Sequence, residues 1–419
     1  MFGRVNLACE KGLQSRGGQQ LLNYPSTEPF DLIITEAGWG ECFYGFIGKF
    51  GSPPVVAISA FGIPPWTSGF MGTSENPSYI PNFFTPYSSR MDFGQRILNF
   101  VMHNLVVFLY EYRHIPRQEA IARKYFKEDI PSFWRIERNF SIFLANILIG
   151  LDDPRPLSPN VIPIGGMHVK AQPDPLPQDL VKFLDEAKDG FIFFSLGSNL
   201  RSDAIAKDKL QVLLDAFSEL PQRVLWKFES HSLLEQPSNV MIGKWLPQSD
   251  ILAHPNIRLF ISHCGRLSVI EAILRGVPIV GVPFFMDQML NLQKCIARGV
   301  AVKLDFLTLT KESVLTAVKE VLNNHSYRIN MNNLSALAKD QPETGLERAV
   351  FWVEYVIRHK GASHLRPAAV SLCWYQYLLL DVLLVFATGA LLVVFLLYFV
   401  LRIIFRQLYI HFNRKPKTN

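Results

Sequence analysis

The stretch that decides the fold runs from Trp245 to Gln288 and reads WLPQSDILAHPNIRLFISHCGRLSVIEAILRGVPIVGVPFFMDQ. Two short apolar runs within it, residues 258–262 and 277–282, are typical of parallel strands buried in the middle of a sheet. The residues between them predict a helix that ends at Gly276. The pattern therefore predicts a strand, a helix and a second strand of an α/β domain.

Polar residues follow both predicted strands. His263 and Gly265 come after the first strand, and Asp287 and Gln288 come after the second. Gly265 would let the backbone approach a ligand closely, and a helix opening near Ser268 would direct its free N–H groups at a phosphate. The side chains at the second strand could bind the hydroxyls of a hexose.

Two further side chains fit the same ligand. Glu271 lies one helical turn after Ser268 on the same face, where its carboxylate could accept hydrogen bonds from both hydroxyls of a ribose. Trp245 offers a face for a flat base. The series as a whole, rather than any one member, indicates a site for a nucleotide sugar.

Each residue of the series also has a structural interpretation. Ser268-x-x-Glu271 matches a helix capping box, and Asp287 could cap the next helix, predicted to end near Gly299. A single His such as His263 is often structural, and a single Trp is often part of a core. Core packing does not require this polar series after consecutive strands, so we favour the binding site.

The segment resembles the signature of the UDP-glycosyltransferase family, in its membrane-bound animal form and most closely its invertebrate branch. Further likeness lies at Phe193–Ser198, Val224–Phe228, Asn160–Met167 and Arg348–Arg366, so the resemblance covers nearly all of the chain. It implies an α/β fold of the GT-B type, with two Rossmann-like domains that face a cleft.

The resemblance assigns a role to each candidate residue. It implies that Trp245 stacks on uracil, that Glu271 binds the ribose, and that Asp287 and Gln288 bind the sugar. The resemblance also implies that Gln248 lies near the base and that Ser198, His263 and Gly265 hold the diphosphate. Ser268, at the expected helix start, and Lys227, where relatives often keep Arg, are the remaining donor-site candidates.

Three residues of the signature depart from the commonest family pattern. Cys264 replaces a Gly of animal members, although plant members carry Cys there, and Leu267 replaces an Asn of vertebrate members. Arg266 is unusual at its position. Its guanidinium could contact the diphosphate or point to solvent, and we favour solvent.

The resemblance implies an inverting transfer in which an early His takes the proton of the acceptor hydroxyl. We expect that His to precede the present chain, which resembles a family member shortened at its N-terminus. Glu36 stands where relatives keep the carboxylate that orients the His. An ordinary carboxylate at a strand end is the equal alternative, and His103 and His114 are not expected to replace the base.

Composition narrows the function classes. The chain has 419 residues, 49% of them hydrophobic, and a net charge of +6. Five basic residues and no acidic ones follow Asp381, which leaves 37 basic against 36 acidic residues elsewhere. This near balance argues against a nucleic-acid partner. The five cysteines have no metal-binding spacing, and disulfide pairs cannot be assigned. The resemblance implies a reaction without a metal and without a cofactor besides the UDP-sugar co-substrate.

The predicted organisation has five parts. They are a partial acceptor-binding domain at 1–169, a donor-binding domain at 170–366, a juxtamembrane segment at 367–381, a transmembrane helix at 382–401 and a basic tail at 402–419. Residues 93–127 are predicted to be helical with apolar side chains on more than one face. They could line an acceptor pocket or rest on a membrane, but we favour plain domain core.

Residues 382–401 contain no charge and are long enough to span a bilayer. The basic tail predicts a cytosolic C-terminus and a lumenal body, with Trp374, Tyr375 and Tyr377 at the interface. Lys415 and Lys417 resemble a dilysine signal of endoplasmic reticulum membrane proteins. Sequons at Asn139, Asn324 and Asn333 would then be usable for glycosylation.

The resemblance implies transfer of a hexose to a hydroxyl of a small lipophilic acceptor, as in detoxification. We prefer UDP-glucose as the donor because invertebrate relatives favour it, and UDP-glucuronic acid is the other candidate. The alternative function is a membrane-anchored protein that binds UDP-sugar without turnover, in a homo- or hetero-oligomer with family members. A transporter is excluded because only one span is predicted.

Overall fold

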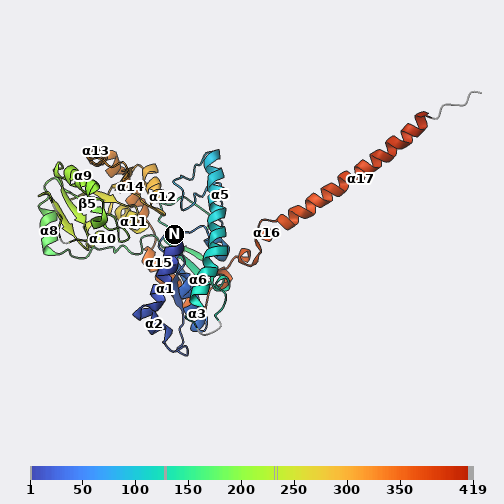
Figure 1. The fold of residues 1–419 in the computed structure, drawn as a ribbon, viewed down its shortest axis with the longest axis horizontal. Helices are drawn as coiled ribbons and strands as arrows, with labels where there is room; N and C mark the ends of the chain where they lie inside the picture. The colour runs from blue at the N-terminus through green and yellow to red at the C-terminus, as the bar shows by residue number, and fades with distance from the viewer. Residues whose placement is uncertain (1, 127–129, 231, 234, 414–419) are drawn as a thin grey trace, which may run out of the picture. The chain divides into compact units, whose positions relative to one another are not determined.

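A computed structural model describes residues 2–126, 130–230, 232–233 and 235–413. The chain forms two compact units, Met1–Arg366 and Pro367–Asn419, which are described separately (Figure 1). The first unit holds two parallel sheets, so the predicted α/β class is confirmed.

The first sheet has four parallel strands in the order β1-β2-β3-β4. The strands are β1 (Ile33–Glu36), β2 (Val55–Ser59), β3 (Ile142–Ala145) and β4 (Val161–Pro163). The helices between its strands and before them are α1 (Phe2–Gln14), α2 (Arg16–Leu22), η1 (Glu41–Tyr44), α3 (Gly45–Lys49), α4 (Thr67–Met71), α5 (Phe93–Leu109), the π-helix η2 (Tyr110–His114), α6 (Ile115–Ala122) and α7 (Phe133–Glu137). Residues of β3 are fully buried, as expected for a strand covered on both faces.

The second sheet has six parallel strands in the order β10-β9-β8-β5-β6-β7. The strands are β5 (Phe191–Ser195), β6 (Arg223–Lys227), β7 (Val240–Gly243), β8 (Ile257–Ser262), β9 (Ile279–Gly281) and β10 (Ala301–Lys303). In the sequence, the helices that precede, separate or follow these strands are α8 (Gln178–Asp185), η3 (Ser202–Ala204), α9 (Lys207–Ser218), α10 (Gln248–Ile251), α11 (Arg266–Arg275), α12 (Gln288–Ala297), α13 (Lys311–Asn323), α14 (His325–Lys339) and α15 (Gly345–Arg358). The apolar runs that predicted two strands thus form β8 and β9, with α11 between them.

Strands β5 and β8 are neighbours in the second sheet, so the loops that follow them lie side by side. β5 lies between β8 and β6 in the middle of the sheet, and all of its side chains are buried. Because parallel strands end at the same edge, the loops after β5 and β8 meet there, where ligands of doubly wound sheets bind.

α15 belongs to the first sheet in space although it follows the second sheet in sequence. Ala349 and Val356 of this helix pack in one core cluster with Val56, Ile142 and Leu144 of the first sheet. The segment 170–366, predicted as the donor-binding domain, therefore contributes a helix to the core of the other domain.

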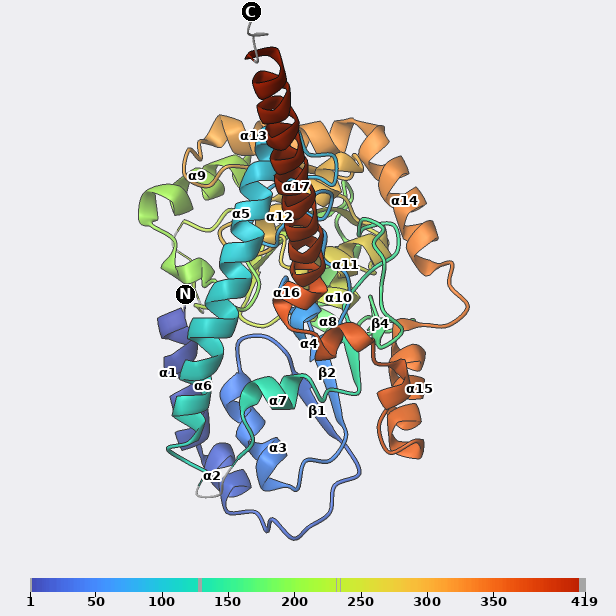
Figure 2. The ribbon, with the colours of Figure 1, turned by 90° about the vertical axis from the view of Figure 1, so that its right-hand side faces the viewer.

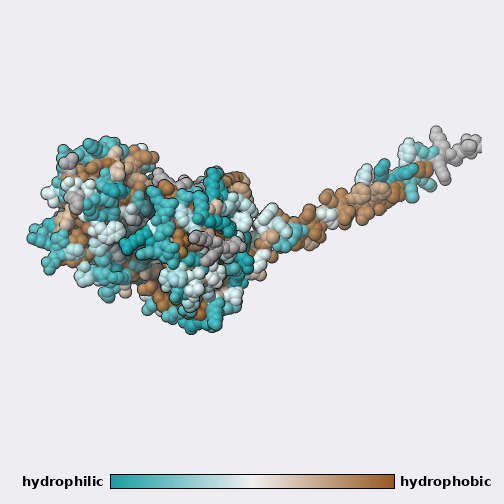
Figure 3. Space-filling view, turned by 60° about the horizontal axis from the view of Figure 1, so that its bottom comes forward, coloured by the Kyte–Doolittle hydropathy of each residue, from teal (hydrophilic) through white to brown (hydrophobic). Residues whose placement is uncertain are grey.

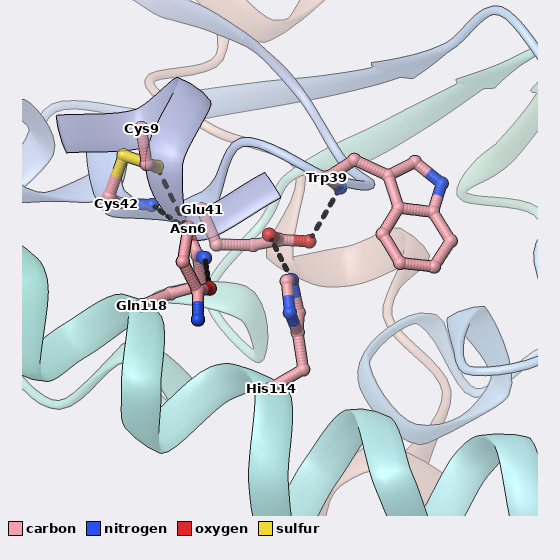
Figure 4. The surroundings of a disulfide bond; sticks show 7 residues. All are labelled: Asn6, Cys9, Trp39, Glu41, Cys42, His114 and Gln118. Atoms are coloured by element: carbon pink, nitrogen blue, oxygen red, sulfur yellow. Dashed lines mark hydrogen bonds and ion pairs between the residues drawn. A yellow bond between two sulfur atoms is a disulfide. The ribbon is translucent and has the colours of Figure 1, made fainter. Parts of the chain in front are cut away.

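A disulfide joins Cys9 of α1 to Cys42 of η1, with the two Cα atoms 6.2 Å apart (Figure 4). The backbone N–H of Cys42 donates to Gln118 Oε1 at 3.1 Å, so α6 supports the same corner. The sequence left the cysteine pairing open. Cys264, Cys295 and Cys373 are free.

The second unit contains η5 (Ala368–Ser371), α16 (Trp374–Tyr377) and α17 (Leu380–Asn413). α17 is 34 residues long, and every one of its residues is exposed (Figure 3). Among the described residues it is the one helix long and apolar enough to cross a membrane, and it includes the predicted span at 382–401. Lys415 and Lys417 of the predicted retrieval signal lie outside the described residues.

Candidate functional site

The loops after β5 and β8 enclose the ring of His263. A Cβ atom built on Gly197 would lie 2.5 Å from His263 Cε1, and one on Gly265 would lie 2.4 Å from Nε2. Contacts this short do not occur between real atoms, so both glycines are required for the ring to lie where it does. Gly197 also has φ +78, which favours glycine.

His263 is a neutral imidazole at physiological pH. Burial lowers the pKa of His263 to about 4, a hydrogen bond to the Ser195 backbone opposes this shift, and the charge of Lys227 adds to it. A ligand at this edge would therefore meet a neutral ring.

α11 begins beside this ring. Its N-cap is Gly265, and its first residue is Arg266, so the helix opens earlier than the predicted position near Ser268. The N-terminal N–H groups of α11 have no side-chain cap, which leaves them available to an anion. The capping-box interpretation of Ser268 and Glu271 is wrong, because Ser268 lies inside the helix.

Three predicted site residues meet through Gln248. Its Nε2 donates to Ser268 Oγ at 2.9 Å and to Glu271 Oε2 at 2.5 Å, which joins the start of α10 to one face of α11. Burial raises the pKa of Glu271, and the Gln248 hydrogen bond opposes that shift. Trp245 precedes α10 with 78% of its surface exposed, so its ring faces are open to a ligand.

Sequence reasoning missed His168. Its Nε2 lies 3.9 Å from Glu271 Oε1 and 3.3 Å from the backbone oxygen of Leu267. Burial lowers the pKa of this His. The one available signal was its position directly after the family-like segment that ends at Met167.

Asp287 is almost completely buried where α12 begins. Its Oδ2 accepts a hydrogen bond from Asn291 Nδ2 at 2.7 Å, and the same amide nitrogen lies 3.1 Å from the backbone oxygen of Cys264. The alternative that Asp287 caps the helix is not observed, because its side chain makes no capping hydrogen bond. Burial raises the pKa of Asp287.

The remaining donor-site candidates are Gln288, Ser198 and Lys227, which lie on three different segments. Gln288 Oε1 accepts hydrogen bonds from the backbone N–H groups of Phe284 and Phe285 at 2.7 and 3.1 Å, so its amide oxygen shapes the loop after β9. Ser198 is exposed in the turn after β5. Lys227 ends β6 and forms an ion pair with Glu229 at 2.6 Å.

The prediction that Arg266 points to solvent is wrong. Its side chain is buried, forms an ion pair with Asp152, and donates two hydrogen bonds to the backbone oxygen of Asn146 at 3.1 and 2.7 Å. Asp152 also binds Lys294 Nζ at 2.8 Å. Burial favours the neutral acid, but the two cations outweigh it and hold the pKa of Asp152 far below its ordinary value.

The segment that carries Asp152 fastens the first domain to the second. Leu148 and Leu151 belong to the core cluster of the second sheet, and Arg298 of α12 donates to the backbone oxygen of Gly150. The sequence offered no signal for this contact, because its partners lie more than one hundred residues apart.

A cavity of about 340 Å³ lies between the two domains. Asp287, Asn291 and Lys294 line it from the second domain. The first domain contributes apolar and aromatic lining residues, among them Phe61, Ile63, Phe83, Ile147 and Leu157. Its polar lining residues are Asn82, His103, Asp152, Asp153 and the ion pair of Glu75 and Arg155.

Glu75 and His103 in the cavity lining also have shifted pKa values. Burial raises the pKa of Glu75 to about 7, against the effect of Arg155. Burial lowers the pKa of His103, which keeps this imidazole neutral. Sequence reasoning assigned no role to His103, yet this residue lines the same cavity as Asp287.

Glu36 and His114 lie elsewhere. Glu36 ends β1 and is not among the residues that line the cavity, although burial and the carboxylate of Glu41 raise its pKa. His114 is fully buried, with Nε2 2.6 Å from Glu41 Oε2 (Figure 4). The role predicted for Glu36 stays a prediction.

Comparison with known proteins identifies the family. The model of the UDP-glucoronosyl and UDP-glucosyl transferases matches residues 19–415. The chain belongs to this family. It is 44% identical to UDP-glucosyltransferase 2 of Dactylopius coccus over 357 residues, which are 84% of this chain and 68% of that protein. It is 37% identical to human UDP-glucuronosyltransferase 1A6 over 385 residues, which are 91% and 70% of the two chains.

Solved structures agree on the fold. A glycosyltransferase of kitacinnamycin superposes with a TM-score of 0.53 at 18% identity over 84% of this chain and 82% of that one. A spinosyn forosaminyltransferase gives a TM-score of 0.52 at 17% identity over 78% and 76%. These similarities confirm the predicted GT-B fold, and family membership confirms a glycosyltransferase of the UDP-sugar type.

Proposed function

We propose that this protein transfers a neutral hexose from a UDP-sugar to a hydroxyl of a small lipophilic acceptor. The observation that carries the proposal is the bridge that Gln248 makes to Ser268 and Glu271, beside the open N-terminus of α11 and the neutral ring of His263. A bound UDP needs a hydrogen-bond acceptor for its ribose hydroxyls and N–H donors for its diphosphate. Glu271 and the N-terminus of α11 would supply these groups at one edge of the second sheet, where ligands of such sheets bind.

The reaction follows from this arrangement. The acceptor oxygen attacks the anomeric carbon while the bond from that carbon to the diphosphate oxygen breaks, and UDP leaves with the bonding electrons. A basic group takes the hydroxyl proton. The α11 N–H groups would meet the charge that develops on the diphosphate, and Asp287 would hold sugar hydroxyls at the mouth of the cavity.

The charges beside Asp287 support a neutral sugar. A uronic acid donor would need a cation for its carboxylate, but Arg266 and Lys294, the cations next to Asp287, are both bound to Asp152. UDP-glucose therefore fits better than UDP-glucuronic acid. The apolar lining of the cavity supports a lipophilic acceptor.

The proposal includes a membrane location. α17 would span the membrane of the endoplasmic reticulum once, with the donor domain in the lumen and the tail in the cytosol. The three sequon residues Asn139, Asn324 and Asn333 are exposed, as lumenal glycosylation requires. Endoglycosidase treatment of the expressed protein should lower its apparent mass on a gel if the proposed orientation holds.

A second candidate is a protein that binds UDP-sugar without turnover. The position of Glu36 outside the cavity lining favours it, because the predicted orienting carboxylate is then not beside the acceptor. This candidate would act in an oligomer with active family members.

One experiment separates the two candidates. The full chain in lipid nanodiscs is titrated with UDP, and UDP release is measured with UDP-glucose or UDP-glucuronic acid and a panel of phenols. Turnover with UDP-glucose supports transfer, binding without turnover supports the second candidate, and absence of UDP binding contradicts both.

A further inference from the structure

A second cavity, of about 480 Å³, lies at the opposite edge of the first sheet from the cavity between the two domains. Val55 begins β2 and Ser141 directly precedes β3, and both residues line this second cavity. The cavity between the domains is lined instead by Phe61 and Ile147, which follow the carboxyl ends of the same strands. We call the second cavity the amino-edge cavity.

Four segments that are far apart in the sequence form the walls of the amino-edge cavity. Its lining residues come from α3, from residues 52–55, from residues 131–141 around α7, and from residues 360–366 after α15. Helices α3, α7 and α15 all pack beside the strands of the first sheet (Figure 2). The cavity is therefore built by tertiary packing within the first unit.

The charged residues of this lining are all cations. Arg135, Lys360 and Arg366 line the cavity, and among the described residues no Asp or Glu does. None of the three forms an ion pair within the part of the chain that the structure describes. In the cavity between the domains, by contrast, Arg155 is paired with Glu75. A cavity lined by charges of one sign raises the local concentration of the opposite ion, so the amino-edge cavity should attract anions.

Arg366 keeps unused hydrogen-bond donors. Its Nη1 and Nη2 atoms both donate to Asn139 Oδ1 at 3.4 Å, and its Nε atom has no hydrogen-bond partner among the described residues. Burial lowers the pKa of Arg366, and the charge of Arg138 acts in the same direction. A guanidinium group has five N–H donors, so this one can still donate to the oxygens of an anion.

Hydroxyl groups complete the lining of the amino-edge cavity. Ser52, Ser141 and Ser363 line it beside the cations. The segment after α15 comes close to the start of β3 at Gly361, where an added Cβ atom would lie 3.7 Å from Ser141 Oγ. The φ of Gly361 is +111, a conformation that favours glycine. Cationic and hydroxyl donors thus converge from two segments that the chain places more than two hundred residues apart.

We propose that the amino-edge cavity binds a soluble phosphorylated small molecule with at least two negative charges. Arginine matches the oxygens of a phosphate group through paired N–H donors, and three cations suffice for the charge of such a ligand. The volume of the cavity lies within the range of small-molecule sites and exceeds the need of a single phosphate ion. This inference goes beyond the proposed transfer reaction and does not depend on it.

A bound anion would join the segment after α15 to the end of α7. Arg366 and Lys360 come from the first of these segments and Arg135 from the second. Because a ligand that binds the folded chain alone stabilises it, we expect saturating inorganic pyrophosphate to raise the Tm of the first unit by about 2–4 °C.

Calorimetry with inorganic pyrophosphate tests the proposal. The full chain is made in a bacterial host, so that no glycan at Asn139 covers the cavity, and is titrated in phosphatidylcholine nanodiscs at about 0.15 M salt. Arg366→Gln should weaken binding about tenfold and abolish the rise in Tm. The matched control is Arg358→Gln, an exposed cation of α15 that pairs with Glu354 outside the cavity. Equal weakening in both variants, or no binding of millimolar pyrophosphate to the wild type, overturns the proposal.

Pyrophosphate also resembles the diphosphate of the donor, so a second variant separates the two sites. Gly265→Ala would place a Cβ atom against the His263 ring and disturb the candidate donor site. Binding at the amino-edge cavity should survive this change, whereas binding that disappears with it belongs to the donor site and contradicts the proposal. Thermal melts identify a variant that fails to fold, in which case Arg366→Gln and Arg358→Gln decide.

A third comparison separates a soluble ligand from a lipid headgroup. The titration is repeated in nanodiscs that contain phosphatidylserine. Unchanged pyrophosphate binding supports a soluble ligand. Loss of pyrophosphate binding would assign the cavity to an anionic headgroup and contradict the proposal. Because the measurements need no turnover, failure of this inference and failure of the proposed transfer are separate results.

Discussion

The two domains build their parts of the site in different ways. In the second domain the candidate donor contacts around Gln248, His263 and Asp287 come from one segment of strand, helix and strand. In the first domain the cavity wall is assembled from Phe61, Phe83, His103 and Arg155, which lie on separate loops and helices. The candidate donor site can therefore be predicted from one continuous segment of sequence, whereas the cavity wall of the first domain depends on tertiary packing.

The largest effect should come from closing the space around His263. Gly265→Ala would place a Cβ atom 2.4 Å from the Nε2 atom of the ring and displace it or the start of α11. Because a displacement of about 1 Å in a reactive site costs about 100-fold in rate, we expect kcat/KM for the UDP-sugar to fall by about that factor. The control is Gly17→Ala, where no heavy atom lies within 4 Å. A loss below threefold would show that the ring is not part of the donor site.

The substitution Glu271→Gln tests whether the Glu271 carboxylate binds the ribose of UDP. A hydrogen bond to a charged group contributes about 1.5–3 kcal/mol, so we expect UDP to bind about tenfold more weakly by calorimetry. If the carboxylate binds ribose hydroxyls, the wild type should prefer UDP to its 2′,3′-dideoxy analogue and the variant should not. Glu354→Gln, at an exposed position of α15, is the matched control. An unchanged preference in Glu271→Gln would assign the ribose elsewhere.

Asp152→Asn tests whether the domain contact also sets donor choice. The change frees Arg266 and Lys294 beside Asp287, so the ratio of activity with UDP-glucuronic acid to that with UDP-glucose should rise about fivefold. Asp153→Asn is the control, since its contact with Arg298 is longer, at 3.7 Å. A ratio that stays constant while both activities fall would leave Asp152 with a role in packing alone.

The smallest effect is expected in the pH dependence of stability. The folded-state pKa of His263 is lowered to about 4 from 6.5, so between these pH values the unfolded chain binds a proton that the folded chain does not. Stability should therefore rise with pH from about 4 to 6.5 and be fully present above that range. We expect the Tm of His263→Gln to rise a few degrees less than that of the wild type across this interval. His325→Gln, at an exposed position, should follow the wild type.

Sequence reasoning succeeded where interactions are local. The strands around His263 and the helix that carries Glu271 follow from apolar runs and turn residues within a few positions of each other. The exact start of α11 was missed by two residues, because Gly265 serves as N-cap without a side chain that could signal it.

Sequence reasoning failed where the partner is distant. Arg266 was assigned to solvent because Asp152, which neutralises it, lies 114 positions away in the chain. The pairing of Cys9 with Cys42 could not be deduced for the same reason. Helix α5 was assigned to the core because an apolar helix is normally buried, yet Phe93, Leu98 and Phe100 of this helix are exposed. The buried, hydrogen-bonded Asn99 shows which side of α5 faces inward.

The position of α15 has a consequence for biosynthesis. The face of the first sheet formed by Val56, Leu144 and Ile164 is covered by Ala349 and Val356, and about 190 residues separate Ile164 from Val356. At roughly 5–20 residues per second, a ribosome needs roughly 10–40 s to make that interval. During this time α15 cannot yet cover the apolar surface of the nascent first sheet, which leaves that surface open to unwanted contacts until the helix has been made.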